Sequence, residues 1–439
     1  MTDFSLTHHG AHHTVTGSCH ELRIGQSAIL VDCGQFQGEE SRSLAIDFPI
    51  QQIEAVVITH AHIDHVGRLP WLLAAGYQGP IYCTPATAEL IPLLLRDGLT
   101  LQLGLARSQI QLILQRIKKQ IRVLDYGRWL RVELKKEASF AYLRLTSAGH
   151  ILGSAMVELR LADEQVVVFS GDLGPNNTPL LPDPVSPPRA DLLVLESTYG
   201  DKQHDNVEQR AQRLSEIIQR SLQDGGAILI PAFSVGRTQE LLFDIERLIF
   251  EHDLPATMPI ILDSPMAVEV TRLYRRFKKL WGGEAKQRLD LQRHPLAFEQ
   301  CVTIDGYREH HRLVNRLKQS GEPAIVIAAS GMCQGGRIMD YLSALLPDPR
   351  TDVIFAGFQA EGTLGRELQE GAQQVLIDQH RVEVKAQIHT MSGYSAHADQ
   401  ADLVKFVEGI EQGRKEIRLV HGEPEAQQVL AERLGFGCD

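Results

Sequence analysis

The sequence predicts an α/β protein in which a second α/β domain interrupts the first. Over the first 200 residues, short apolar β-branched runs each end in a polar residue. From about residue 206, strands and helices alternate regularly, which is typical of a doubly wound sheet. After about residue 371, histidines again follow apolar runs. We therefore expect one domain to comprise residues 1–203 and 376–439, and the inserted domain to comprise residues 204–375.

The first domain is expected to carry its functional groups where strands end. α/β proteins build their sites beyond the carboxyl ends of the strands of a sheet. Polar residues follow each apolar run here, and apolar residues at three- and four-residue spacing between the runs predict helices. The expected strands are residues 28–31, 55–58, 166–169 and 192–195, the polar ends are Asp32, Thr59 with His60, Asp172 and Glu196, and the expected helices are residues 85–96 and 99–120.

The inserted domain repeats one unit, a short apolar strand followed by a helix. Such repetition predicts a parallel sheet with helices on its faces. The expected strands are residues 227–230, 259–262 and 324–328, and the helices that follow them are residues 235–251, 266–280 and 337–346.

Composition narrows the class of protein. No run of 18 apolar residues occurs, so no membrane span is expected. The polar N-terminus has no apolar signal-peptide core, and the six scattered cysteines form no C-x-x-C pair, so we expect a cytoplasmic protein with reduced thiols. The net charge of −11 argues against a non-specific nucleic-acid binder. It leaves room for local basic tracks at residues 116–136 and 272–279, each of which could equally be a solvated helix face.

The segment His60-Ala-His62-Ile-Asp64-His65 is the central signal. Four candidate metal ligands lie within six residues, directly after an expected strand. Histidine is the commonest zinc ligand and aspartate adds a harder oxygen donor. The alternative is a polar helix cap built on Asp64. Three imidazoles this close together are costly unless they bind something, which favours a metal.

Three further residues complete two ligand sets. His150, Asp172 and His421 each stand beside a glycine, and a single residue of this kind is a weak signal. Two metals about 3.5–4 Å apart are the usual arrangement for attack on a phosphodiester. The first expected set is His60, His62 and His150, the second is Asp64, His65 and His421, and Asp172 could bridge them.

In order and context these residues, with Asp32 in Val31-Asp32-Cys33-Gly34, resemble the metallo-β-lactamase superfamily. The inserted domain resembles that of its β-CASP branch, as do three motifs: Glu196-Ser-Thr-Tyr-Gly-Asp201, Ser395-Ala-His-Ala-Asp399 and His421-Gly-Glu423. Within the branch, the chain is most similar to bacterial and archaeal relatives of the endonuclease subunit of the mRNA 3′-end cleavage factor. The resemblance implies an αββα sandwich with an inserted doubly wound β-CASP domain.

The resemblance also implies an activity, a metal and roles for residues. The implied enzyme is a zinc-dependent ribonuclease that leaves 5′-phosphate and 3′-hydroxyl ends, mainly as an endonuclease, with exonuclease action left open. It would hold two Zn²⁺, although Mn²⁺ also suits His and Asp ligands. The implied catalytic residues are Asp32, Asp64, Asp172, Glu196 and His397, with His397 as general acid held by Glu196.

RNA phosphates need donors, and two strand-to-helix junctions of the inserted domain could supply them. Ser330 begins a glycine-rich loop before a helix, and Arg237 lies at an equivalent junction. Tight-turn geometry alone explains such glycines about as well. We expect both residues to contact substrate.

Three other functions remain open from the sequence. A small-molecule hydrolase of the superfamily would share the metal ligands, but it would need neither the insertion nor the pair Glu196 and His397. A non-catalytic scaffold would not need a complete ligand set. A DNA-processing nuclease is harder to separate, and His421 favours RNA by resemblance. The oligomeric state also stays open, a homodimer included.

Overall fold

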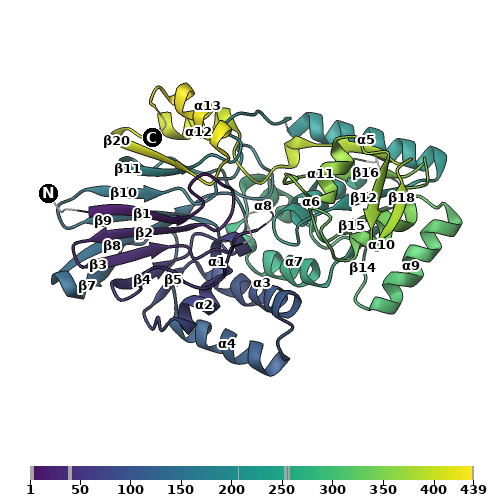
Figure 1. Cartoon of the computed structure of the whole chain (residues 1–439). Coiled ribbons are helices and arrows are strands. Elements are labelled where there is room, and N and C mark those ends of the chain that lie inside the picture. The colour runs from purple at the N-terminus through teal and green to yellow at the C-terminus, as the bar shows by residue number, and fades with distance from the viewer. Residues whose placement is uncertain (1–3, 38–41, 206, 252–254, 256–257, 438–439) are drawn as a thin grey trace. The chain divides into compact units, whose positions relative to one another are not determined.

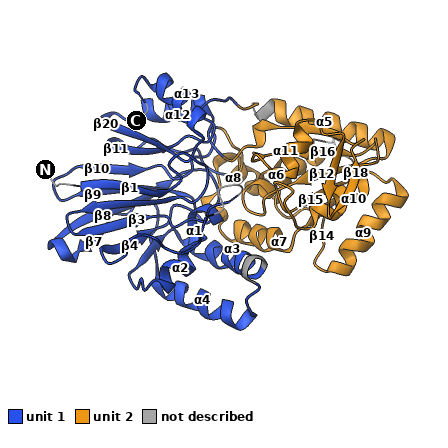
Figure 2. Cartoon of the chain, in the orientation of Figure 1, with its two compact units in different colours: residues 1–176, 181–203, 397–439 blue, residues 177–180, 204–396 orange. Residues whose placement is uncertain are grey.

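The computed structural model describes residues 4–37, 42–205, 207–251, 255 and 258–437. The chain divides into two compact units (Figure 2). Unit 1 contains residues 1–176, 181–203 and 397–439, and unit 2 contains residues 177–180 and 204–396. Unit 2 includes residues 376–396, which were expected in the other domain. One reason is that β19 (Gln387–Thr390) pairs with β16 (Asp352–Phe355) of the inserted sheet. The expected domain limits themselves stay a prediction.

Unit 1 contains two six-stranded sheets (Figure 1). The first sheet has, in spatial order, β1 (Phe4–Gly10), β2 (Cys19–Ile24), β3 (Ser27–Val31), β4 (Ile53–Val57), β5 (Ile81–Cys83) and β6 (Ile121–Val123). The second sheet has β20 (Gln412–Val420), β11 (Arg189–Glu196), β10 (Val166–Phe169), β9 (Ala155–Leu161), β8 (Ser139–Ser147) and β7 (Leu130–Leu134).

The core of unit 1 lies between these sheets. Period-two alternation places one side of every strand in this layer. Val31 and Val57 come from the first sheet, Leu145 and Phe169 come from the second, and all four are buried in one apolar cluster. A second cluster joins the outer face of β10 and β11 to helices α12 (Gln400–Glu408) and α13 (Pro424–Leu434).

Helices near the first sheet complete a four-layer arrangement (Figure 1). They are α1 (Ile63–Val66), α2 (Leu69–Ala74), α3 (Pro85–Leu103) and α4 (Arg107–Gln120), and a 3₁₀ turn, η2 (Lys135–Glu137), follows β7. The unit is thus the αββα sandwich that the resemblance implies, and this part of the fold prediction is confirmed.

Unit 2 is built on one parallel sheet, as the strand–helix alternation predicts. Successive residues of β12 (Ala227–Pro231) point to opposite faces, and Leu229 and Ile230 are both fully buried, so both faces are covered. Val326 and Val353 join helices α9 (Tyr307–Ser320) and α10 (Ile338–Leu345) in one apolar cluster. The spatial order is β14 (Cys301–Thr303), β13 (Ile260–Asp263), β15 (Ala324–Ala328), β12 (Ala227–Pro231), β16 and β19.

The remaining elements of unit 2 surround this sheet. They are α5 (Val207–Asp224), α6 (Arg237–Phe250), α7 (Pro265–Arg276), η3 (Lys278–Leu280), α8 (Gly283–Asp290), α9 (Tyr307–Ser320), α10 (Ile338–Leu345), α11 (Leu364–Gln369), the hairpin β17 (Gln374–Ile377) with β18 (His380–Glu383), and η4 (Ser392–Tyr394). The doubly wound insertion is confirmed. Across the described ranges, no helix is both long and apolar enough to cross a membrane.

Two expected helices have different limits in the structure. The sequence predicted helices at residues 85–96 and 99–120, but α3 continues to Leu103 and α4 begins at Arg107. Gly104 adopts the left-handed conformation that ends a helix, with φ of 57°. The break therefore lies at Gly104, whereas Gly98 is accommodated inside α3.

Candidate metal centre

The candidate site lies where the strands of unit 1 end. β10, β11 and β20 are neighbours and run parallel, with Phe169 beside Val194 and Glu196 beside Val420. Their carboxyl ends therefore meet at one edge of the second sheet. Asp172 and His421 follow the first and last of these strands, and Glu196 ends the middle one.

The segment after β4 supplies ligands from the first sheet. His62 stands at the N-cap position of the short helix α1, and Asp64 and His65 lie in the single turn of that helix. The chain packs tightly here, because a Cβ atom on Gly34 would lie only 1.6 Å from the carbonyl oxygen of Asp64. A glycine at position 34 thus permits the loop after β3 to lie directly against the ligand-bearing turn.

The first predicted ligand set converges. Nδ1 of His62 lies 3.1 Å from Nε2 of His60 and 3.1 Å from Nε2 of His150. Oδ2 of Asp172 lies 3.5 Å from Nε2 of each of these two partners. Three imidazoles and one carboxylate oxygen therefore point at one position.

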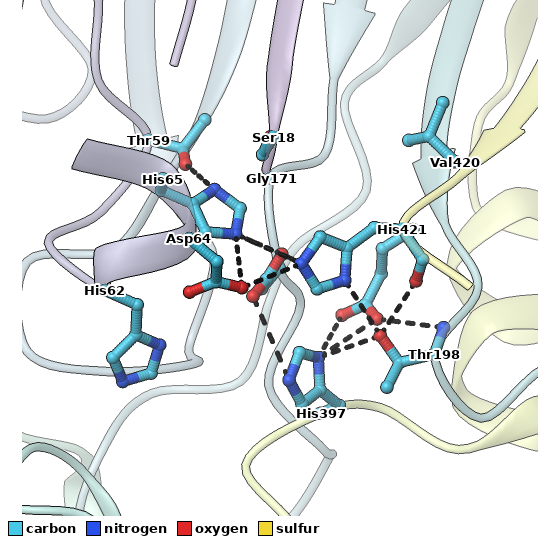
Figure 3. A network of polar contacts seen from close by, with 12 residues as sticks. Ser18, Thr59, His62, Asp64, His65, Gly171, Thr198, His397, Val420 and His421 are labelled. Carbon is cyan, nitrogen blue, oxygen red and sulfur yellow. Dashed lines mark hydrogen bonds and ion pairs between the residues drawn. The ribbon is translucent and has the colours of Figure 1, made fainter. Parts of the chain in front are cut away.

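The second predicted set converges beside it (Figure 3). Nε2 of His65 and Nε2 of His421 lie 3.2 Å apart, and Oδ2 of Asp64 lies 3.2 Å from Nε2 of His421. Oδ1 of Asp172 lies 3.3 Å from Nε2 of His65. The two oxygens of Asp172 thus face different sets, which is the geometry of a bridging carboxylate.

Hydrogen bonding alone does not satisfy the two sets. A neutral imidazole nitrogen carries either one proton or one lone pair. Nδ1 of His62 therefore cannot pair well with two ring nitrogens that both lie 3.1 Å away. Oδ1 of Asp172 is buried and accepts no well-aligned hydrogen bond from any described residue. Such a donor set fits a cation with His and Asp ligands.

Charge and burial also favour a cation. Burial, then the charge of His65, holds the pKa of His60 well below its usual range, and burial lowers the pKa of His62 to about 4. Burial would raise the pKa of Asp64, but the nearby histidines outweigh it and hold that pKa at about 2. Metal binding requires neutral imidazoles and ionised carboxylates, and His60, His62 and Asp64 are in these states. Burial would lower the pKa of His65, but Asp172, Asp32 and Asp64 outweigh it and raise that pKa well above its usual range, so a metal that binds there would displace a proton.

Asp32 positions His65 and is not itself in a ligand set. It is buried, and its Oδ2 accepts a hydrogen bond of 2.8 Å from Nδ1 of His65. The backbone N–H and the hydroxyl of Thr59 both donate to the same carboxylate, each at 2.8 Å. A carboxylate on the outer nitrogen of a ligating histidine fixes the ring and its tautomer.

His397 lies beside Asp64 and His421 of the second set (Figure 3), and Glu196 holds its outer nitrogen. Nδ1 of His397 donates to Glu196 at 3.1 Å, and Nε2 lies 3.9 Å from Oδ2 of Asp172. Burial lowers the pKa of His397, but the charge and hydrogen bond of Glu196 outweigh burial and raise it to about 9. His397 and Asp64 are each 19% exposed, whereas Asp172 is 2% exposed. The site is therefore open to solvent and to a bound molecule on the side of His397 and Asp64.

Comparisons with known proteins agree with this geometry. The metallo-β-lactamase superfamily model matches residues 14–232, the Beta-Casp domain model matches residues 238–368, and the Zn-dependent metallo-hydrolase RNA specificity domain model matches residues 381–437. Ribonuclease TTHA0252 of Thermus thermophilus is 38% identical over 97% of this chain and 95% of its own length. The chain belongs to the β-CASP family of the metallo-β-lactamase superfamily.

Other β-CASP relatives are archaeal. Transcription termination factor FttA of Methanothermobacter thermautotrophicus is 34% identical over 95% of this chain and 67% of its own length. The factor of the same name from Methanocaldococcus jannaschii is 31% identical over 94% of this chain and 66% of its own length. The predicted family and enzyme class are confirmed: this β-CASP protein is a homologue of zinc-dependent metallo-hydrolase ribonucleases, with a His and Asp metal site.

The two predicted substrate contacts lie in unit 2 of this β-CASP protein. Arg237 begins α6 and is 7% exposed, and Ser330 follows β15 with its hydroxyl accepting from the N–H of Gln334. The expected junctions are present, but contact with RNA stays a prediction for both residues.

Two hydroxyl residues beside the ligands were missed by the sequence analysis. Thr59 holds Asp32, and the hydroxyl of Thr198 lies 3.1 Å from Nδ1 of His421 (Figure 3). Both stand next to residues already singled out, Thr59 before His60 and Thr198 inside the motif that begins at Glu196. A threonine one or two residues from a ligand or an acid was the available signal, and it is too common to be specific.

Proposed function

We propose that this chain is a ribonuclease that hydrolyses RNA phosphodiester bonds with two zinc ions, leaving 5′-phosphate and 3′-hydroxyl ends. We expect it to act mainly as an endonuclease in the cytoplasm, with manganese as the other metal that its ligands suit. The observation that carries the proposal is Asp172, whose two oxygens face two adjacent ligand sets while His397 stands beside them. The relative named a ribonuclease and the match to an RNA specificity domain favour RNA as substrate.

The metal ligands are divided between two ions in this proposal. His60, His62 and His150 would hold one ion; Asp64, His65 and His421 would hold the other; Asp172 would bridge them. When bound, the ions would activate a water and neutralise charge that develops on the phosphate. Asp32 keeps His65 in the tautomer whose Nε2 is free to bind, through its contact with Nδ1.

His397 would deliver the proton that the leaving group needs. The P–O3′ bond breaks as water adds to phosphorus, and the 3′ oxygen must gain a proton to leave as a hydroxyl. Glu196 accepts the hydrogen bond from Nδ1, so Nε2–H of His397 points into the site. The attacking water releases one proton to solvent as it adds to phosphorus, and Nε2 regains its proton from solvent on the exposed side of the ring, so the protons balance.

A DNA-processing nuclease is the second function that the site could perform, because the ligands and His397 do not distinguish ribose from deoxyribose. A direct comparison separates the two substrates. We expect cleavage of a single-stranded RNA and little or no cleavage of a DNA of the same sequence under the same zinc concentration. Faster cleavage of the DNA would overturn the substrate assignment.

A circular RNA and a 5′-labelled linear RNA of matched sequence test the rest of the proposal. Cutting the circle requires endonuclease action, and we expect a linear product with a 5′-phosphate that a phosphatase can remove. Asp172→Ala protein, purified in the same way, controls for contaminating nucleases. Intact circles beside shortened linear RNA would show that the enzyme is an exonuclease, and cleavage undiminished by a chelator would refute the metal mechanism.

A further inference from the structure

Strand β7 is an edge of the second sheet of unit 1. It pairs with β8 along one side, from Leu130 beside Leu143 to Leu134 beside Ser139. Among the described residues, no backbone hydrogen bond outside that pairing involves Leu130–Leu134. Helices α12 and α13 lie at the opposite end of the same sheet, beside β20 and β11 (Figure 1). An edge strand with unused N–H and C=O groups is a template for another strand.

The two faces of β7 differ in chemistry. Val132 and Leu134 are buried in the core between the sheets, and Leu130 packs partly against it. Arg131 and Glu133 lie on the outer face with side chains 52% and 57% exposed, and they form an ion pair of 3.0 Å with each other. The strand therefore reads Leu-Arg-Val-Glu-Leu, apolar on one face and oppositely charged on the other.

We propose that β7 is a homodimerisation strand, which pairs antiparallel with β7 of a second copy of this chain around a two-fold axis at Val132. In this register Arg131 lies opposite Glu133 of the second copy, and Glu133 lies opposite Arg131 of the second copy. Leu130 likewise meets Leu134 of the second copy on the apolar face. Directly opposite residues of an antiparallel pair share a face, so both faces of β7 are complementary to themselves.

The surface around β7 suits a protein partner. Trp129 is 39% exposed, and the guanidinium groups of Arg144 and Arg160 lie 4.5 and 5.1 Å from its ring centre. Tryptophan and arginine are enriched at protein interfaces. Arg144 is paired with Glu158 at 2.5 Å and Arg160 with Glu164 at 3.6 Å, so the acids balance these arginines. That balance disfavours a polyanion such as RNA as the occupant.

Charge reversal at these positions tests the proposed register, because its set of outcomes is expected only if Arg131 faces Glu133 of the second copy. Arg131→Glu places glutamates opposite one another in a homodimer, and Glu133→Arg places arginines opposite one another. We expect each variant to raise the dimer Kd roughly tenfold or more in sedimentation velocity over a protein concentration series. An equimolar mixture of the two variants should restore dimers, because every pair is then of opposite charge. The double variant should also regain the wild-type Kd.

The other edge of the sheet supplies a matched control. Glu416 and Arg418 on β20 form the same kind of pair, at 2.6 Å, with side chains 49% and 42% exposed. β20 is an edge strand as well, but its pairing with β11 shifts register between Ala190 and Leu192, beside Gly413 with φ of 86°, and such a bulge disfavours pairing with another strand. Arg418→Glu should leave the dimer unchanged, and thermal melts should show that all variants are folded. Wild-type protein that stays monomeric at the highest usable concentration would overturn the proposal. So would dimers that survive both β7 variants, or a mixture that fails to reassociate.

Discussion

Asp172 connects the two ligand sets through the two oxygens of one side chain. Oδ2 faces His60 and His150, and Oδ1 faces His65 and His421. The residue is buried, so its charge is little screened by water. Its loss would leave each cation with one fewer anionic ligand, whereas loss of His421 would remove one neutral ligand from one cation.

We therefore predict that Asp172→Ala is more damaging than His421→Ala. Asp172→Ala should lose nearly all RNA cleavage and retain less zinc than His421→Ala, as measured by metal analysis of the purified proteins. Asp125→Ala, at a position 62% exposed, controls for the loss of a carboxylate elsewhere. Wild-type turnover in Asp172→Ala would refute the bridging role.

His397 should be separable from the metal ligands. It touches Glu196 directly, and its Nε2 lies 3.9 Å from Oδ2 of Asp172. We predict that His397→Ala keeps its zinc and binds RNA, while turnover falls roughly 10²–10⁴-fold, the usual contribution of a positioned general acid. Glu196→Gln should show a milder defect. The fold-loss of turnover in the double variant should be smaller than the product of the two single fold-losses, because the residues act as one unit.

A substrate with a better leaving group separates proton delivery from other roles of His397. A phosphorothiolate at the bridging 3′ position needs little protonation to leave. It should therefore restore part of the rate of His397→Ala and none of the rate of Asp172→Ala. Loss of zinc from His397→Ala would show instead that this histidine is a ligand.

At the scale of elements, the strand ends could be predicted but the helix limits could not. The runs before Asp32, His60, Asp172 and Glu196 are apolar and β-branched, which is a local property of the sequence. The limits of α3 depend on which of two glycines ends a helix. Gly98 lies inside α3 and Gly104 ends it, and only the packing of the helix distinguishes them.

The residue types of the candidate site could be predicted from the sequence, but the way in which they come together in space could not. The cluster from His60 to His65 is contiguous, so its spacing signals a metal. His150, Asp172 and His421 come from three separate strand ends, and single histidines beside glycines are not specific. The strand order that gathers them, β20-β11-β10-β9-β8, is a long-range property, and only family resemblance supplied it in advance.

We predict that the basic segment of α7 and η3 contributes to RNA binding. Residues 272–279 include five basic residues and no acidic residue. Neutralising several of them should weaken RNA binding and flatten its dependence on salt, because fewer counterions are released. An unchanged salt slope would show that the segment is only a solvated helix face. The residues to change are Arg272, Arg275, Arg276, Lys278 and Lys279.

A buried ion network should make the stability of unit 2 depend on pH. Nδ1 of His310 on α9 lies 2.6 Å from Asp263 at the end of β13, and Nε2 lies 2.8 Å from Asp340. Burial lowers the pKa of His310, but hydrogen bonds to both carboxylates outweigh it and raise that pKa above its usual value. The added stability is then present below the unfolded pKa, about 6.5, and is lost as pH rises through the folded value.

We predict that the difference in unfolding temperature between wild type and His310→Gln is largest near about pH 6 and shrinks as pH rises. Hydrogen bonds also hold the pKa of Asp263 low against burial, so its contribution is lost only as pH falls below its unfolded value of about 3.9. His380→Gln, on the exposed hairpin of β17 and β18, is the control. A difference that stays constant across this range would contradict the ion-pair account.

At the scale of the whole molecule, metal binding should stabilise unit 1 selectively. The ligands come from residues 60–65, 150, 172 and 421, which are far apart in the chain but all belong to unit 1. A ligand that binds only the folded state stabilises it, by about 2.7 kcal/mol at a concentration 100-fold above its Kd. This binding free energy should protect the segments that the metal joins against local opening, because these segments must separate for the site to open.

Hydrogen exchange read by mass spectrometry can locate that effect. We predict that chelation speeds exchange in peptides that cover residues 58–66, 148–156, 170–175 and 418–423. Without cations, the ring nitrogens around His62 stay poorly paired and the carboxylate of Asp172 stays buried without a counter-charge, so these turns should open more often. Peptides from β12 and β15 should be unchanged, because that sheet lies in unit 2 and holds none of these ligands. Adding zinc back should reverse the change, and adding magnesium should not, because histidine nitrogens suit zinc and magnesium prefers oxygen ligands. Equal acceleration in both units would mean that the metal stabilises the whole chain as one cooperative body, and no acceleration would mean that the ligand sets are held by the fold alone.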